Sequence, residues 1–184
     1  MAPRPAPDLD HRRDQITRAA CAVAAADGWD AVTMRRIATE IGVTQPVIYS
    51  AFAGGRQAVV DAVALAGFDA IASALEAVPA EPRARMQAYL DFAAEQPHLY
   101  AAMFSMPSGL EFGTGSGPEA LGRAFAAIRA AFPGADDTTA DDTAAEVAWA
   151  TVHGLATLGI SRRLPPAGSG DRLDFAHRAL TQER

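Results

Sequence analysis

Four histidines and one cysteine are the first residues of this 184-residue chain to consider as metal ligands or as catalytic groups. The histidines are scattered, so no HxxxH or HExxH pair brings two ligands to one face of a helix. Cys21 lies among alanines, where a buried inert thiol is expected, and a single cysteine excludes an internal disulfide. The sequence also lacks a glycine-rich phosphate loop and a GxSxG elbow. We therefore predict no enzymatic activity, no cofactor and no metal site.

The residues from Thr33 to Phe52 have types and spacing that could instead recognise DNA. Thr33 can cap a helix, whose apolar side consists of Met34, Ile37, Ala38 and Ile41. Gly42 can adopt the left-handed conformation that reverses the chain, and Val43 can then pack between two helices. The pattern predicts a short helix that ends in a tight turn.

A second short helix is expected directly after this turn. Thr44 is its expected cap, and Pro46 is tolerated in the first turn because no backbone donor is needed there. Ile48 and Phe52 predict the buried side, and the outward side consists of Gln45, Val47, Tyr49 and Ser50. Two such helices form a helix-turn-helix, which presents its second helix to the major groove. The pattern alone also fits helical proteins that do not bind DNA.

The order of these residues resembles the signature of the TetR family of bacterial transcriptional repressors. The matching positions are Thr33, Ile37-Ala38, Gly42-Val43-Thr44, Ile48-Tyr49 and Phe52, near the N-terminus as in that family. The resemblance implies that Tyr49 contacts phosphate, and that base edges and backbone face Thr44, Gln45, Pro46 and Val47. The family usually has a lysine three residues after the phenylalanine. This chain has Gly55 there, so Arg56, the nearest cation, is the candidate phosphate contact.

The charges are divided unevenly along the chain, whose net charge is −6. Residues 1–56 hold seven arginines and six acids, whereas residues 57–184 hold nine arginines and sixteen acids. We call residues 1–56 the head and residues 57–184 the body. Because the head has so small an excess of positive charge, it attracts DNA only weakly at long range, and a few well-placed cations must provide the phosphate contacts. Arg35 and Arg36 are candidates for this role, with solvated surface charge as the competing interpretation.

Further helices are predicted on both sides of this motif. Their expected ranges are residues 10–27, 56–78, 83–95, 97–106, 119–132, 138–162 and 171–182. The helix at 56–78 is apolar on too many sides for a surface helix, so we expect it to connect two parts of the molecule. We expect a loop at 105–118. The acids at 136–142 favour the start of a helix, and metal ligation is the weaker alternative, because they lack the spaced glycine and glutamate of a calcium loop.

Aromatic residues and methionines are concentrated in the helices expected at 83–95 and 97–106. They fit either a core with methionine as gap filler or an adaptable pocket for a mostly apolar small molecule. The segment Pro97–Phe104, and the later Trp149–Leu155, resemble the ligand-binding domain of a TetR subgroup marked by tryptophan, histidine and glycine. The candidate ligand contacts are Tyr89, Phe92, Tyr100, Met103, Phe104, Trp149 and His153. His153 also fits a core histidine or a dimer contact.

We predict an all-α protein: a three-helix DNA-binding domain at 1–56, with a disordered arm at 1–9, and a larger helical ligand-binding and dimerisation domain at 57–184. The helix at 138–162 is apolar around most of its circumference, so part of its burial is expected to come from a second copy. The resemblance implies a homodimer that pairs through its last two helices.

The expected function is that of a ligand-responsive regulator, a repressor that leaves a palindromic operator when a small molecule binds. The alternative is a helical ligand-binding or structural dimer that does not bind DNA. Prolines stand where a secretory signal would need an apolar segment, and no uninterrupted apolar run is long enough to cross a bilayer. A cytoplasmic location is therefore expected.

Overall fold

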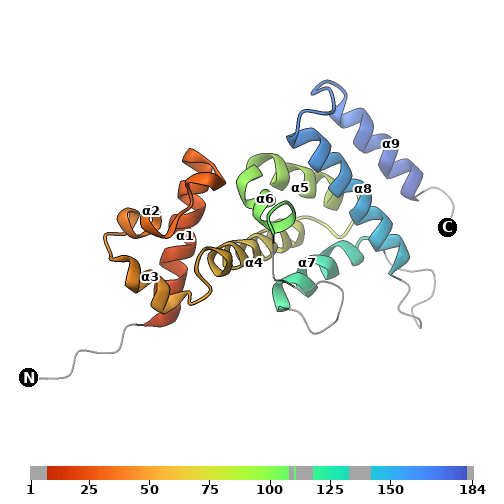
Figure 1. The fold of residues 1–184 in the computed structure, drawn as a ribbon. Helices are drawn as coiled ribbons and strands as arrows, with labels where there is room; N and C mark the ends of the chain where they lie inside the picture. The colour runs from red at the N-terminus through yellow and green to blue at the C-terminus, as the bar shows by residue number, and fades with distance from the viewer. Residues whose placement is uncertain (1–7, 108–109, 111–117, 133–141, 182–184) are drawn as a thin grey trace, which may run out of the picture. The chain divides into compact units, whose positions relative to one another are not determined.

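A computed structural model describes residues 8–107, 110, 118–132 and 142–181 of the chain. These residues form α-helices and one short 3-10 helix, with no strand among them, which confirms the predicted all-α class (Figure 1). The helices are α1 (Leu9–Asp27), η1 (Trp29–Ala31), α2 (Met34–Glu40), α3 (Gln45–Ala51), α4 (Gly55–Glu76), α5 (Pro82–Glu95), α6 (Pro97–Phe104), α7 (Glu119–Arg129), α8 (Thr143–Ile160) and α9 (Ser169–Thr181).

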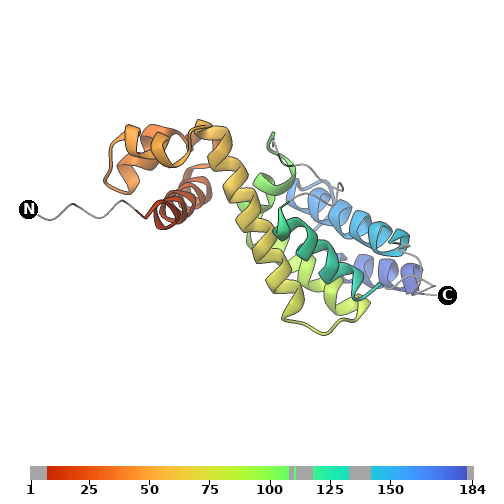
Figure 2. The same cartoon turned by 90° about the horizontal axis from the view of Figure 1, so that it is seen from below.

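The chain divides into two compact units. Unit 1 consists of Met1–Gly67 and His98–Leu110, and unit 2 consists of Phe68–Pro97 and Glu111–Arg184. Unit 1 therefore takes in the first half of α4 and nearly all of α6, in addition to the three-helix head. Within unit 2, α8 and α9 run alongside one another in both views (Figures 1 and 2).

Local residues explain where helix α1 begins and where it ends. The side chain of Asp8 accepts hydrogen bonds from the backbone N–H groups of Asp10 and His11, so it caps the helix. Gly28, with φ of 82°, ends it. Asp8 and Leu9 thus belong to the cap and first turn of α1 and not to the predicted disordered arm, whose other residues lie outside the described part of the chain.

The turn between α2 and α3 has the hydrogen bonding of a Schellman motif. Gly42 has φ of 68°, its N–H donates to Thr39 O (3.3 Å), and the N–H of Val43 donates to Ala38 O (2.9 Å). Val43 packs against the buried cluster of unit 1, which includes Ile37. The predicted reversal at Gly42, with Val43 between the helices, is confirmed.

One apolar cluster holds unit 1 together. It contains the residues that the sequence pattern assigned to the interior, either buried or packed at its edge: Ile16, Val23, Trp29, Ile37, Ile41, Ile48 and Phe52. Helix α4 contributes Val59 and Val63, and α6 contributes Ala102. Trp29 is fixed further because its Nε1 donates to His98 O at 2.9 Å. The position of α3 is therefore set by a common core.

Helix α4 corrects the expectation that no segment is long and apolar enough to span a bilayer. By length and composition its 22 residues pass that test. Half of the apolar window is buried within the protein, and Val59, Val60, Val63 and Phe68 are at most 3% exposed. These residues explain the apolar composition as that of a core helix.

Unit 2 is built from the second half of α4 and from α5, α7, α8 and α9. Helix α5 packs on both α8 and α9, and α7 packs on α8. Arg123 of α7 joins α4 through hydrogen bonds to Ser73 Oγ (2.9 Å) and Glu76 Oε2 (2.6 Å). This contact lowers the pKa of Glu76 and raises that of Arg123.

Several predicted helix boundaries in the body were wrong by two or more residues. Helix α4 ends at Glu76, α6 at Phe104, α7 at Arg129 and α8 at Ile160, each before the predicted limit, and α9 begins two residues early at Ser169. Apolar periodicity does not mark a helix end where the last turn opens into a loop. The loop predicted at 105–118, the acidic run at 136–142 and the first residues of the helix predicted at 138–162 lie mostly outside the described residues.

The left-handed conformation at Gly42 predicts opposite effects for the same substitution at two glycines. Gly42→Ala should lower the free energy of unfolding by about 1–2 kcal/mol, because a Cβ is strained there. Gly122→Ala, at an exposed position of α7 where a Cβ meets open space, should raise it by roughly 0.5–1 kcal/mol. Urea denaturation followed by circular dichroism measures both, and a stabilising Gly42→Ala would contradict the assigned turn.

Candidate nucleic-acid interface

Helix α3 has one face fixed in the core and one face open to solvent. Ile48 is fully buried and Phe52 is 7% exposed, as their spacing predicts. Gln45, Pro46, Tyr49 and Ser50 are exposed, and Val47 is half-buried. The outward residues therefore project from a helix that cannot rotate without exposing Ile48. This is the geometry that a helix needs to read a groove.

The two threonines of the motif differ in what their hydroxyl groups do. Thr33 Oγ1 accepts a hydrogen bond from the N–H of Arg36 (3.1 Å), so it caps α2 as predicted. Thr44 precedes α3 in the cap position, but its side chain makes no cap hydrogen bond, which corrects the predicted role. The exposed Thr44 hydroxyl therefore remains open to an external acceptor.

Tyr49 is a large exposed side chain at the outer side of α3, with 48% of its surface accessible. A Cβ built on Gly55 would lie 3.5 Å from Tyr49 Cε1, so the ring lies next to this glycine. Gly55 has φ of 62°, a conformation that a lysine adopts only with strain. The TetR signature usually has lysine at this position. In this chain the backbone conformation of Gly55 is suited to glycine instead.

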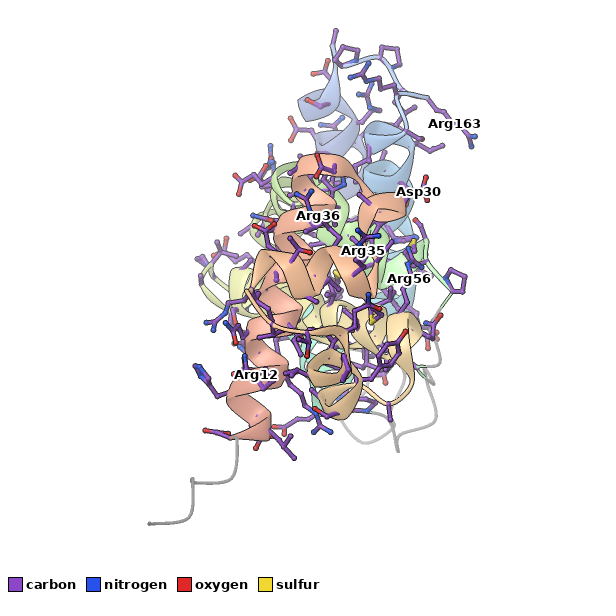
Figure 3. All side chains as sticks on the ribbon, turned by 60° about the vertical axis from the view of Figure 1, so that its left-hand side comes forward. Arg12, Asp30, Arg35, Arg36, Arg56 and Arg163 are labelled. Atoms are coloured by element: carbon purple, nitrogen blue, oxygen red, sulfur yellow. The ribbon has the colours of Figure 1, made fainter. Side chains whose placement is uncertain are left out.

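Arg35 and Arg36 are neighbours in α2 with different ionic surroundings (Figure 3). The Arg36 guanidinium lies 3.2 Å from Asp27 and 3.6 Å from Glu40. Arg35 is exposed and forms no ion pair with any residue that the structure describes. The structure thus gives Arg35 an uncompensated charge and gives Arg36 internal partners.

Arg56 and Arg13 hold parts of the head together. Arg56 donates from Nε to Val32 O (2.9 Å) and from Nη2 to Trp29 O (2.8 Å), which ties the start of α4 to the segment before α2. Arg13 Nε donates to Ala51 O at 3.1 Å, at the C-terminal end of α3. The Arg13 bond could not be predicted from the sequence, because the partners are 38 residues apart. That Arg56 contacts phosphate stays a prediction.

The candidate ligand contacts lie in both units. In unit 2, Trp149 Nε1 donates to the buried hydroxyl of Tyr89 (3.2 Å), and the Trp149 ring meets Phe125 edge-on with centroids 6.1 Å apart. Phe92 and half-buried His153 belong to the same unit. The sequence pattern does not single out Phe125, because its helix lacks the cluster of aromatic residues that marks α5 and α6.

The remaining candidates are part of unit 1. Tyr100 and Met103 are buried, and the Tyr100 ring lies 4.8 Å from that of Phe104. Met103 occupies the space beside Gly67, where a Cβ would come within 2.7 Å of its Cγ and Sδ. The gap-filling role of methionine thus accounts for Met103. A ligand pocket built from these seven residues stays a prediction.

Two titratable groups have pKa values moved by burial. Burial lowers the pKa of His153, which favours the neutral imidazole, and Thr157 Oγ1 lies 3.5 Å from its Nε2. Burial raises the pKa of the Cys21 thiol, which opposes formation of a thiolate. Cys21 packs against the core of unit 1 as a small apolar residue.

Comparison with known proteins identifies the class to which this fold and interface belong. Residues 16–63 match the model of bacterial regulatory proteins of the tetR family, and residues 82–182 match the tetracyclin repressor-like C-terminal domain. The second match alone covers more than half of the chain. The chain belongs to the TetR family of bacterial transcription regulators, with a helix-turn-helix DNA-binding region and a C-terminal ligand-binding domain.

Solved structures have the same fold. A structure described as the putative regulatory protein SCO4313 aligns with a TM-score of 0.75 at 20% identity, covering 99% of this chain and 100% of that one. A tetR-family transcriptional regulator from Streptomyces coelicolor aligns with a TM-score of 0.62 at 18% identity, covering 93% and 78%. BioQ of Mycobacterium smegmatis gives 0.59 at 24%, covering 91% and 94%. A search of curated proteins gives no significant match.

Proposed function

We propose that this regulator is a cytoplasmic repressor that binds a palindromic operator as a homodimer and leaves it when a mostly apolar small molecule binds. The observation that carries the proposal is the exposed outer face of α3, held outward by buried Ile48. We assign residues 1–56 to DNA binding and residues 57–184 to ligand binding and dimerisation. A helical dimer that binds no DNA is the alternative outcome.

The proposed base contacts come from the start of α3. The Gln45 amide can pair bidentately with an adenine edge, and half-buried Val47 can contact a thymine methyl group. Thr33, Thr44, Pro46 and Tyr49 lie where they can contact the backbone and fix the register of the helix. Arg35 supplies the uncompensated positive charge, and Arg36 and Arg56 add charge where their internal partners allow it.

Dimerisation is supported by apolar side chains left exposed on α8 and α9. Phe175 is 70% exposed and Val147 is 49% exposed, with Leu158 and Ile160 also accessible. A shallow groove of about 470 Å³ between α8 and α9, lined mainly by apolar residues, includes Phe175 and Leu180. A second copy related by twofold symmetry would cover this face and set two α3 helices about 34–36 Å apart on one side of the duplex.

The effector would act through a preference for one dimer state. The proposed effector contacts form two sets: Tyr89, Phe92, Trp149 and His153 belong to unit 2, and Tyr100, Met103 and Phe104 belong to unit 1. A preference of roughly 1–3 kcal/mol for a state with wrongly spaced heads lowers DNA affinity about 5- to 150-fold.

A thermal-shift screen followed by DNA-release assays tests whether a small molecule releases the protein from DNA. If no compound that stabilises the protein releases DNA, the repressor is not ligand-responsive.

Removing the base-reading amide should reduce sequence discrimination. Gln45→Ala is expected to weaken binding to the operator by about 1–3 kcal/mol, with little effect on unrelated DNA. Gln96→Ala, an exposed glutamine in unit 2, is the matched control and should bind like the parent. Mobility-shift titrations against the promoter region of its own gene measure both. Equal operator affinity for all three proteins would refute the assigned base contact.

The two neighbouring arginines should differ in their contribution to phosphate binding. Arg35→Ala is expected to weaken binding to all DNA sequences and to reduce the slope of log affinity against log salt by about 1. Arg36→Ala should have a smaller effect, because Asp27 and Glu40 already compensate its charge. Titrations at several salt concentrations make the comparison. A larger effect at Arg36 would show that its ion pairs open on DNA and that the ranking is wrong.

A charge placed on the proposed dimer face should separate the two copies. Phe175→Glu buries a carboxylate in an apolar interface, so we expect monomers in sedimentation velocity and loss of most operator affinity. Ala126→Glu adds the same charge at an exposed position of α7 and should leave a dimer. A Phe175→Glu protein that remains dimeric would place the interface elsewhere.

A further inference from the structure

A cavity of about 800 Å³ lies within unit 2, at the end of α8. Helices α5, α8 and α9 and the turn after α8 all line it. None of the seven candidate ligand contacts is among its lining residues. Its volume falls within the roughly 300–1,000 Å³ of small-molecule sites. It is therefore distinct from the effector contacts proposed above, which we call the aromatic pocket.

The lining of this cavity is mainly apolar, but it includes a group of arginines from the turn after α8 and from α9, which we call the cationic rim. Leu90, Leu155, Ile160, Leu164 and Leu173 contribute the apolar surface. Arg162, Arg163 and Arg172 also line it, together with one carboxylate, that of Asp91. Asp91 Oδ1 already accepts a hydrogen bond from Gln87 Nε2 at 2.8 Å. The rim therefore carries an excess of positive charge in a body with many more acids than arginines.

The turn that forms the rim is held in place from within unit 2. Arg172 donates from Nη2 to Pro165 O (2.7 Å) and from Nη1 to Ala167 O (3.2 Å). The Arg163 N–H donates to Leu158 O (2.8 Å), which closes the end of α8. Arg172 is thus used in fixing the turn. Arg162 and Arg163 are exposed and form no ion pair with any residue in the described ranges.

Arg162 has a left-handed backbone conformation, which glycine adopts freely and arginine adopts only with strain. Its φ is 55°, and its N–H donates to Gly159 O at 3.0 Å, in the position that Gly42 occupies after α2. It is the only non-glycine residue with positive φ among the residues that the structure describes. Such a conformation at a site lined by charged residues points to a function for the side chain. Figure 3 shows the neighbouring Arg163 extending from the same turn.

We propose that this cavity binds a small amphiphilic carboxylate, with its hydrocarbon tail against the leucines and its carboxylate paired with Arg162 and Arg163. Guanidinium groups pair with carboxylates through two parallel hydrogen bonds, and the apolar walls remove the tail from water. This binding is independent of the aromatic pocket and does not require DNA. A neutral molecule of the same length gains the apolar contacts but not the ionic ones.

Calorimetric titration of the full-length protein with octanoate and with octan-1-ol tests the proposal. We expect octanoate to bind at least about 10-fold more tightly than octan-1-ol, because only the carboxylate meets the arginines. Arg162→Gly should reduce this preference, because one of the two arginines that pair with the carboxylate is lost. The same variant should unfold at an equal or higher temperature, because glycine relieves the strain at this position. Arg18→Gln, an exposed arginine of α1, should leave both affinities unchanged.

A second pair of variants locates the binding site. Gly159 lines the cavity, and a Cβ there would meet nothing within 4 Å, so Gly159→Leu should fill the space and abolish octanoate binding. Gly122→Leu, at an exposed position of α7, should bind octanoate like the parent. Octanoate binding that survives Gly159→Leu, no binding to the parent, or equal affinity for acid and alcohol would overturn the proposal.

Discussion

The left-handed turn at Gly42 is the constraint on which the DNA-binding surface depends. The hydrogen bonds from Gly42 and Val43 back to α2 end that helix, so α3 can begin within a few residues. Val43 packs against the core at the same turn. Ile48 and Phe52 then have one available direction, into the cluster formed with α1 and α4. The outward direction of Gln45 and Tyr49 follows from that burial. The interface is thus produced by the packing of its opposite face.

Arginine side chains divide into those that stabilise the fold and those that remain available. Arg13 and Arg56 donate to backbone carbonyl groups of unit 1, and Arg172 does so in unit 2. Hydrogen bonds from a charged donor to a carbonyl are worth about 1.5–3 kcal/mol each, so these residues are costly to redirect toward a ligand. Arg35 in the head and Arg163 in the body lack such partners among the described residues. The head therefore has an arginine without an ion pair to any described residue, Arg35, although its net charge is low.

The sequence predicted the head closely because its signals are local. Capping by Thr33, reversal at Gly42 and the four-residue spacing of Ile48 and Phe52 each act within a few residues. The body was predicted less well. Its helix ends are not marked by capping residues, and the partners of Trp149 and Arg172 depend on how distant segments pack. The cavity at the end of α8 could not be predicted, because neither its volume nor the conformation of Arg162 follows from apolar periodicity.

The central claim is that the outward face of α3 contacts base pairs. A crystal structure of the dimer with its operator tests it most directly. The account predicts α3 of each copy in successive major grooves, with the Gln45 amide within hydrogen-bond distance of a base edge and Arg35 near a phosphate. A complex in which α3 faces away from the groove, or in which another surface of the chain contacts the bases, would contradict it.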